Sequence, residues 1–187
     1  DHHEGGESLD WFTLGNDYAH TRYSSANQIT PENFEDLDDA WVWDGASFDA
    51  RSGRSTPSYI DGVLYTVAGP RRHVIALDPA NGELLWSYRE PNTFRYEYSM
   101  RKDYGKGVAY SEVDGRGVIY MVSPGFFLTA LDAKTGQPLE GFGEPVPIEG
   151  FPETGVVDLI KHLDLDLEDY DPYQGIPLEK GYITSSS

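Results

Sequence analysis

The chain has 187 residues, 39% of them apolar and 13% aromatic, which is enough material for a sizeable core in one domain or in part of a larger one. Its formal net charge of -18 would repel a nucleic-acid backbone or an anionic bilayer over most of the surface, so we expect no nucleic-acid partner. Cysteine is absent, which excludes disulfides and thiol chemistry, and no apolar run approaches the ~18 residues of a transmembrane segment.

Composition also predicts the fold class. The chain contains 13 Tyr, 8 Phe and 4 Trp together with 20 Gly and 12 Pro. Aromatic residues favour strands, whereas glycine and proline favour tight turns. We therefore predict an all-β fold.

Residues 1–10 are predicted to form a polar N-terminal tail of the kind that signal cleavage leaves. The tail starts Asp1-His2-His3, and a histidine in third place can complete a square-planar Cu(II) or Ni(II) site. A tail histidine without any function is the favoured alternative.

An opening segment follows over residues 11–45. Thr30 can cap a helix and Pro31 suits its first position, so the pattern predicts a short helix over 31–37. The alternation in "AWVWD", residues 40–44, then predicts a strand.

Two stretches of the chain repeat one pattern. "DGVLYTVAGPRRHVIALDPANGELLW" is similar to "RGVIYMVSPGFFLTALDAKTGQPLEGF", and their "ALD" motifs start 54 residues apart. Each stretch reads as a strand, a break at Gly-Pro or Pro-Gly, a second strand and an Asp-x-x-x-Gly turn. The aspartate can accept bonds from backbone amides two or three residues later, and the glycine can take the positive φ that closes the turn.

Repeats of this length with about four short strands each are typical of β-propeller blades. A propeller closes with about four to eight blades, so we expect this chain to supply only the first two to three blades of a longer ring. The predicted divisions are an opening segment over 11–45, repeats over about 55–90 and 105–143, an acidic insertion over about 144–180, and the start of a further blade over 181–187. Within the insertion, "HLDLDLEDYD" (162–171) is rich in the oxygen ligands of a calcium site. It lacks the glycine spacing of a calcium-binding loop, so an exposed acidic loop is favoured.

The chain resembles the quinoprotein dehydrogenases, which bind pyrroloquinoline quinone (PQQ) on the axis of an eight-bladed β-propeller. The opening segment, with its Arg22-Tyr23-Ser24 element, is similar to the family's start. "ALDPANGELLW" is similar to the family's tryptophan-docking motif, which implies that Trp86 wedges between neighbouring blades. "KGVAY" resembles the family's Arg-Gly-Val-Ala-Tyr at the second blade, and "ALDAKTGQPLEGFG" resembles the glucose-dehydrogenase-like branch. The missing vicinal cysteines weigh against the methanol and ethanol branch.

The resemblance implies cofactor contacts at four positions. Lys106 stands where the family has a PQQ-pairing arginine, and Arg54 stands where the alcohol branch has a cofactor-contacting glutamate. The family's third-blade hydroxyl falls at Thr184 or Ser185. The alternative for Arg54 and Lys106 is that each is an ordinary surface charge. Arg71-Arg72-His73 is predicted to be a solvated loop tip. The ligands of a Ca²⁺ or lanthanide ion and the catalytic base are expected outside this segment.

The implied function is oxidation of an alcohol or sugar hydroxyl in the periplasm or outside the cell. Electrons would pass to cytochrome c or a membrane quinone, and the remainder of the propeller chain would be a structural partner. A cofactor-free propeller that serves as a binding scaffold is the alternative function.

Overall fold

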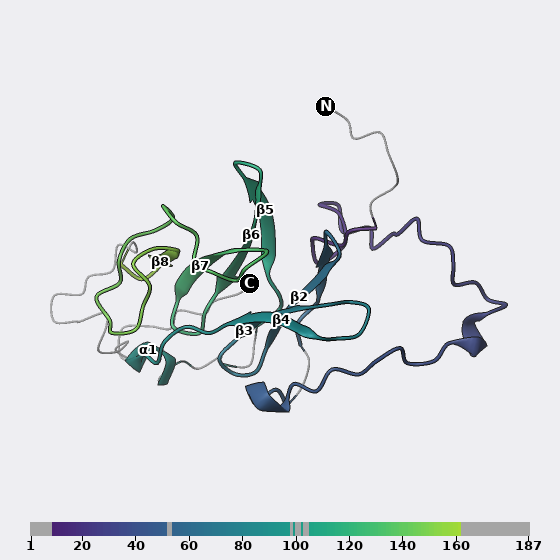
Figure 1. Cartoon of the computed structure of the whole chain (residues 1–187), viewed down its shortest axis with the longest axis horizontal. Coiled ribbons are helices and arrows are strands. Elements are labelled where there is room, and N and C mark those ends of the chain that lie inside the picture. The colour runs from purple at the N-terminus through teal and green to yellow at the C-terminus, as the bar shows by residue number, and fades with distance from the viewer. Residues whose placement is uncertain (1–8, 52–53, 98, 100–101, 103–104, 162–187) are drawn as a thin grey trace.

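The computed structural model describes residues 9–51, 54–97, 99, 102 and 105–161. These residues form two four-stranded antiparallel sheets, each a meander in which consecutive strands are neighbours (Figure 1). The all-β prediction is confirmed. The first sheet comprises β1 (Ser58–Ile60), β2 (Val63–Ala68), β3 (His73–Leu77) and β4 (Leu84–Tyr88); the second comprises β5 (Ala109–Val113), β6 (Arg116–Val122), β7 (Phe127–Asp132) and β8 (Val156–Asp158).

Helical structure in the described part of the chain is limited to short turns. These are η1 (Phe34–Asp36), η2 (Ala46–Phe48) and α1 (Phe94–Glu97). Figure 1 shows the opening segment leaving the sheets as a long excursion through η1 before it returns at η2. An isolated antiparallel bridge between Trp11 and Tyr59 holds the start of this segment against β1.

The two sheets repeat one another in register as well as in sequence. Tyr65 pairs with Ala76 between β2 and β3, and Tyr120 pairs with Ala130 between β6 and β7. Residues that match between the two sequence stretches therefore occupy equivalent positions in the two sheets. The second sheet takes its fourth strand, β8, from much farther along the chain than β4 lies in the first.

The predicted turn chemistry is present in both repeats. The carboxylate of Asp78 accepts the amide two residues later at 2.8 Å, and that of Asp132 accepts the amides two and three residues later at 3.0 and 2.9 Å. Gly82 and Gly136 take φ values of +73° and +69°, which L-residues with a side chain rarely adopt. The repeated Asp and Gly therefore set the direction in which each chain leaves its third strand.

The largest apolar cluster lies between the two sheets and draws on both. Burying these side chains removes apolar surface from water, which is the main favourable term in folding. The cluster comprises Ile60, Tyr65, Val67, Val74 and Ala76 of the first sheet with Ile119, Met121, Leu131 and Ala133 of the second half of the fold, and Trp86 and Tyr88 pack against it.

Trp86 docks the first sheet onto the turn of the second. Its indole Nε1 donates to the carbonyl of Ala133 at 3.0 Å. A Cβ built on Gly136 would lie 2.5 Å from the indole ring, so the glycine is what lets the ring lie flat on the turn. The Tyr65 hydroxyl donates to the same Ala133 carbonyl at 3.0 Å. The sheet-to-sheet role predicted for Trp86 is present in the structure.

Trp41 repeats this docking on the first sheet. Its Nε1 donates to the carbonyl of Pro79 at 2.8 Å, and a Cβ on Gly82 would lie 2.6 Å from its ring. Pro79 and Gly82 stand one and four residues after Asp78, as Ala133 and Gly136 stand after Asp132. The two tryptophans therefore pack in the same way on the Asp-x-x-x-Gly turns of the two sheets.

Two secondary-structure predictions for the opening segment are wrong. The helix over 31–37 is reduced to the 3-10 turn η1, which buries no residue and has no side-chain cap. A short helix needs tertiary packing to form, and this one has none among the described residues. Residues 40–44 alternate in burial, with Val42 81% exposed, but they form no strand in the described part of the chain.

The packing of Trp86 on Gly136 can be tested by substitution of the glycine. Gly136→Ala should lower the free energy of unfolding of the full-length protein by about 2 kcal/mol more than Gly115→Ala does. Gly115 has a similar φ of +75° but no atom within 4 Å of its built Cβ, so both variants share the backbone strain and differ in the tryptophan clash. Urea denaturation measures the difference, and equal losses would contradict the docking role.

Candidate functional site

The segments that lead into β1 and β5 lie side by side at one end of the sheets. The amide of Thr56 donates to the carbonyl of Lys106 at 2.7 Å and ties the two segments together. Gly107 permits this approach, because a Cβ there would lie 2.9 Å from the Thr56 carbonyl oxygen. Arg54 stands two residues before Thr56, so the structure brings the Arg54 and Lys106 segments to the same end, with both residues exposed.

A cavity of about 270 Å³ adjoins Lys106. Its walls are mostly apolar, and Lys106 is the one charged residue among the residues that line it. An apolar cavity with one cation at its side suits a flat ligand that carries negative charge. The other lining residues are Leu14, Thr56, Ser58, Gly107, Val108, Ala109, Tyr120, Met121, Val122 and Leu128.

The prediction that Arg71-Arg72-His73 is a solvated loop tip is wrong. Arg72 is only 2% exposed, and its Nη1 donates to the carbonyl of Val122 at 2.8 Å, across the gap between the sheets. A left-handed φ of 52° at Arg72 turns the side chain into the interface. Arg71 lies 4.0 Å above the ring of Tyr96, and His73 begins β3 and is half-buried.

Glu90, just after β4, is a buried carboxyl group that sequence reasoning missed. It is 1% exposed, and neither of its oxygens makes a hydrogen bond of good geometry with the described residues. Burial raises its pKa to about 7, against the lowering effects of Ser123, the Gly125 amide, and the charges of Arg71 and Arg72. No local pattern in the sequence marks this residue, because its burial depends on turns from both sheets.

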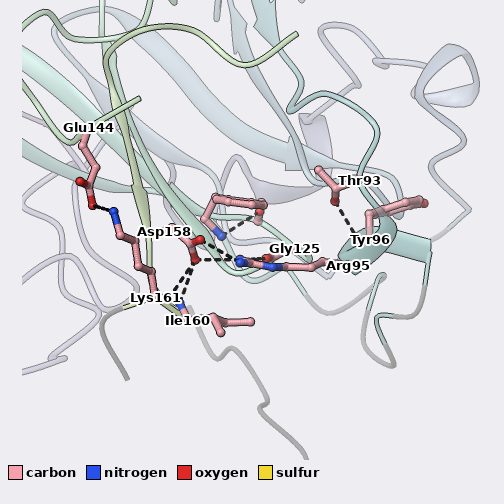
Figure 2. A network of polar contacts seen from close by, with 10 residues as sticks. Thr93, Arg95, Tyr96, Gly125, Glu144, Asp158, Ile160 and Lys161 are labelled. Atoms are coloured by element: carbon pink, nitrogen blue, oxygen red, sulfur yellow. Dashed lines mark hydrogen bonds and ion pairs between the residues drawn. The ribbon is translucent and has the colours of Figure 1, made fainter. Parts of the chain in front are cut away.

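A buried ion pair anchors α1 to the second sheet (Figure 2). Arg95 in α1 makes a two-pronged contact with Asp158 in β8 at 2.7 and 2.8 Å, and both residues are at most 1% exposed. Burial raises the pKa of Asp158, but the bonds and charge of Arg95 and the amides of Ile160 and Lys161 outweigh it and lower the pKa overall. The partners are 63 residues apart in sequence, so no spacing could have revealed them.

Other predicted site residues lie outside the described part of the chain. These are Thr184 and Ser185, the acidic run 162–171, and the histidines of the N-terminal tail. Within the described residues, no three His, Asp or Glu side chains form a group able to hold a metal ion. No helix of the described chain is long and apolar enough to cross a membrane.

Comparison with known proteins identifies the family. Residues 11–176 match the family model described as "PQQ: Glucose/ethanol/alcohol dehydrogenase, beta-propeller domain". The chain belongs to this family. The two sheets are therefore β-propeller blades of the quinoprotein type, as the resemblance implied.

The PQQ-family relatives are alcohol dehydrogenases. The chain is 37% identical over 139 residues to the 1-butanol dehydrogenase (cytochrome c) of Thauera butanivorans, covering 71% of this chain and 18% of that protein. It is 35% identical over 136 residues to the dehydrogenase subunit of the alcohol dehydrogenase (quinone) of Gluconobacter oxydans, covering 71% and 17%. The chain thus spans less than a fifth of the length of these two relatives.

Solved structures agree with the family. The quinohemoprotein alcohol dehydrogenase from Comamonas testosteroni is 32% identical with a TM-score of 0.58, over 69% of this chain and 18% of that one. A europium-containing methanol dehydrogenase is 28% identical with a TM-score of 0.57, over 68% of this chain and 22% of that one. The glucose-dehydrogenase-like branch is not confirmed by these names and stays a prediction.

The described residues of this PQQ-family chain fit part of the cofactor. PQQ is flat and carries several carboxylates, which suits an apolar cavity with Lys106 beside it and Arg54 at the same end. Lysine supplies one point charge where a guanidinium would supply a planar pair of donors. A PQQ carboxylate bound at this end would meet one point charge at residue 106, without two-pronged geometry.

The buried pair between Arg95 and Asp158 predicts a large loss on removal of one partner. Asp158→Asn should lower the free energy of unfolding by about 3–5 kcal/mol, because it removes the carboxylate that neutralises the buried Arg95 charge. Glu144→Gln is the matched control, since it breaks the exposed pair with Lys161 at 2.9 Å and should cost at most about 1 kcal/mol. Denaturant unfolding of both full-length variants measures this, and equal effects would refute the role of the buried pair.

Glu90 predicts a pH dependence of stability. Its folded pKa, about 7, is above the ordinary 4.5, so its contribution is present below pH 4.5 and is lost as pH rises to about 7. Glu90→Gln should remove this loss, up to about 3 kcal/mol, whereas exposed Glu83→Gln should not. The groups that face Glu90 are Arg71, Arg72 and Tyr88. The unfolding free energies of the variants are compared from pH 4.5 to 8; parallel curves for Glu90→Gln and the parent protein would contradict the assignment.

Proposed function

We propose that this chain forms part of a PQQ-dependent dehydrogenase that oxidises an alcohol or sugar hydroxyl. The observation that carries the proposal is the convergence of the Arg54 and Lys106 segments, tied by the bond between Thr56 and Lys106, beside an apolar cavity. Membership of the PQQ family supports this choice of ligand. Alcohols are the favoured substrates because the relatives are named for them, and a sugar hydroxyl offers the same reacting group.

The residues of this chain would bind and orient the cofactor. PQQ, when bound, supplies a quinone that accepts a hydride from the substrate carbon. The Lys106 ammonium group would neutralise one carboxylate of PQQ, and Arg54 would add positive charge at the same end. The apolar cavity walls would exclude water and strengthen this attraction. We place a Ca²⁺ or lanthanide ion, its ligands and the catalytic base outside this segment, together with contacts from Thr184 or Ser185.

The partners follow from the same family relationship. We propose that electrons pass to cytochrome c or to a membrane quinone, the two acceptors that the names of the relatives contain. The remainder of the propeller would complete the ring around the cofactor. We also propose a periplasmic or secreted location, which the acidic surface fits.

The charge of Lys106 is tested by titrating the full-length protein with PQQ in the presence of Ca²⁺. Lys106→Ala should weaken PQQ binding at least about tenfold, because one charge-assisted contact is lost. Lys106→Arg should bind as tightly as the parent protein or tighter, since it restores a planar pair of donors. Equilibrium dialysis measures the affinities.

Lys134→Ala serves as the control for this titration, because Lys134 is exposed on the turn after β7 and touches no residue of the site. It should leave PQQ affinity unchanged. A Lys106→Ala protein that binds PQQ as the control does would contradict the cofactor contact. No PQQ uptake by any form would reject the enzyme and favour the scaffold function.

A further inference from the structure

Arg72 lies directly beneath the segment that carries Lys106. The stem of Arg72 packs against Gly105: a Cβ built on Gly105 would lie 3.0 and 3.1 Å from the Cγ and Cδ atoms of Arg72. Gly105 immediately precedes Lys106 in the chain. The backbone next to Lys106 therefore rests on the arginine stem and admits no larger residue without movement.

The head of Arg72 is bonded to another residue that lines the same cavity. Its Nη1 donates to the carbonyl of Val122 at 2.8 Å, and Val122 lines the cavity beside Lys106. One side chain from the turn between β2 and β3 thus supports both the Lys106 segment and the end of β6. Arg72 is 2% exposed and has a left-handed φ of 52°, so its side chain is buried in the interface between the two sheets.

Glu90 is the acidic group whose charge acts on Arg72. Burial lowers the pKa of the Arg72 guanidinium, and the nearby charge of Glu90 opposes that effect. Glu90 itself is enclosed by the turn between β6 and β7, since a Cβ on Gly125 would lie 3.0 Å from its Oε1. A buried cation is stable only with such compensation.

We propose that Arg72 is the positioning residue that sets Lys106 in place for the cofactor. The inference rests on the proposed function of the Lys106 site. Arg72 does not touch the cofactor in this account; it acts through the backbone of Gly105 and Lys106 and through the cavity wall at Val122. Supporting residues of this kind commonly change ligand affinity by about 10- to 100-fold.

A double-mutant cycle on PQQ affinity in the full-length protein tests the proposal. Arg72→Met keeps the stem and removes the guanidinium, and it should weaken PQQ binding at least about tenfold. In the Lys106→Ala background the same change should have no further effect, because the residue through which Arg72 acts is gone. Arg72→Lys should recover part of the affinity, and Arg116→Met, an exposed arginine at the far end of β6, should change nothing.

Amide hydrogen exchange gives a readout that does not need the cofactor. The Thr56 amide donates to the Lys106 carbonyl, so its exchange rate reports whether Lys106 is held in place. Arg72→Met should raise that rate at least about tenfold and leave the Leu131 amide in β7 unchanged.

The outcomes separate this inference from the function on which it rests. Equal losses of affinity for Arg72→Met with and without Lys106 would overturn the positioning role, as would unchanged Thr56 exchange. Exchange that rises equally at Thr56 and Leu131 would show general loosening of the fold and would also overturn it. If the parent protein takes up no PQQ, the proposed function fails, and Thr56 exchange still decides whether Arg72 positions Lys106.

Discussion

The packing of Trp86 on the turn of the second sheet is the contact on which the rest of the structure depends. The indole needs a bare glycine beneath it and a carbonyl at its edge, and the Asp-x-x-x-Gly turn supplies both at Gly136 and Ala133. With the indole ring packed on this turn, the two sheets share one apolar core. The segments before β1 and β5 then come within one hydrogen bond of each other, which brings the Arg54 and Lys106 segments together. Trp41 on the first turn shows that the device is modular, since the same contacts recur with Pro79 and Gly82.

Charge is distributed in a way that the net value conceals. The chain carries -18 overall, yet residues 51–106 hold nine of its 14 lysines and arginines against six acidic residues. This stretch includes Arg54 and Lys106 at the candidate site and the buried Arg72 and Arg95. The acidic surface elsewhere favours solubility, whereas this stretch can attract an anion.

Local chemistry decided which features could be predicted from the sequence. The paired Asp78 and Asp132 turns were predictable because each depends on residue types at fixed short spacing. The docking of Trp86 was expected from the resemblance of its motif to the tryptophan-docking motif of the family. The Arg95–Asp158 pair and the burial of Arg72 and Glu90 were not, because each depends on segments that only the folded sheets bring together. The strand predicted over 40–44 failed for a related reason. Its alternation is real, but a strand also needs a neighbour, and the described residues offer none.

The central claim is that two blades, fixed by one tryptophan, present Lys106 to a carboxylate of PQQ. An experimental structure of the full-length protein with PQQ bound tests it most directly. The account predicts the Lys106 ammonium within ion-pair distance of a PQQ carboxylate, with the stem of Arg72 against Gly105 below it. PQQ bound away from this end of the two sheets, or Lys106 directed away from the cofactor, would contradict the account.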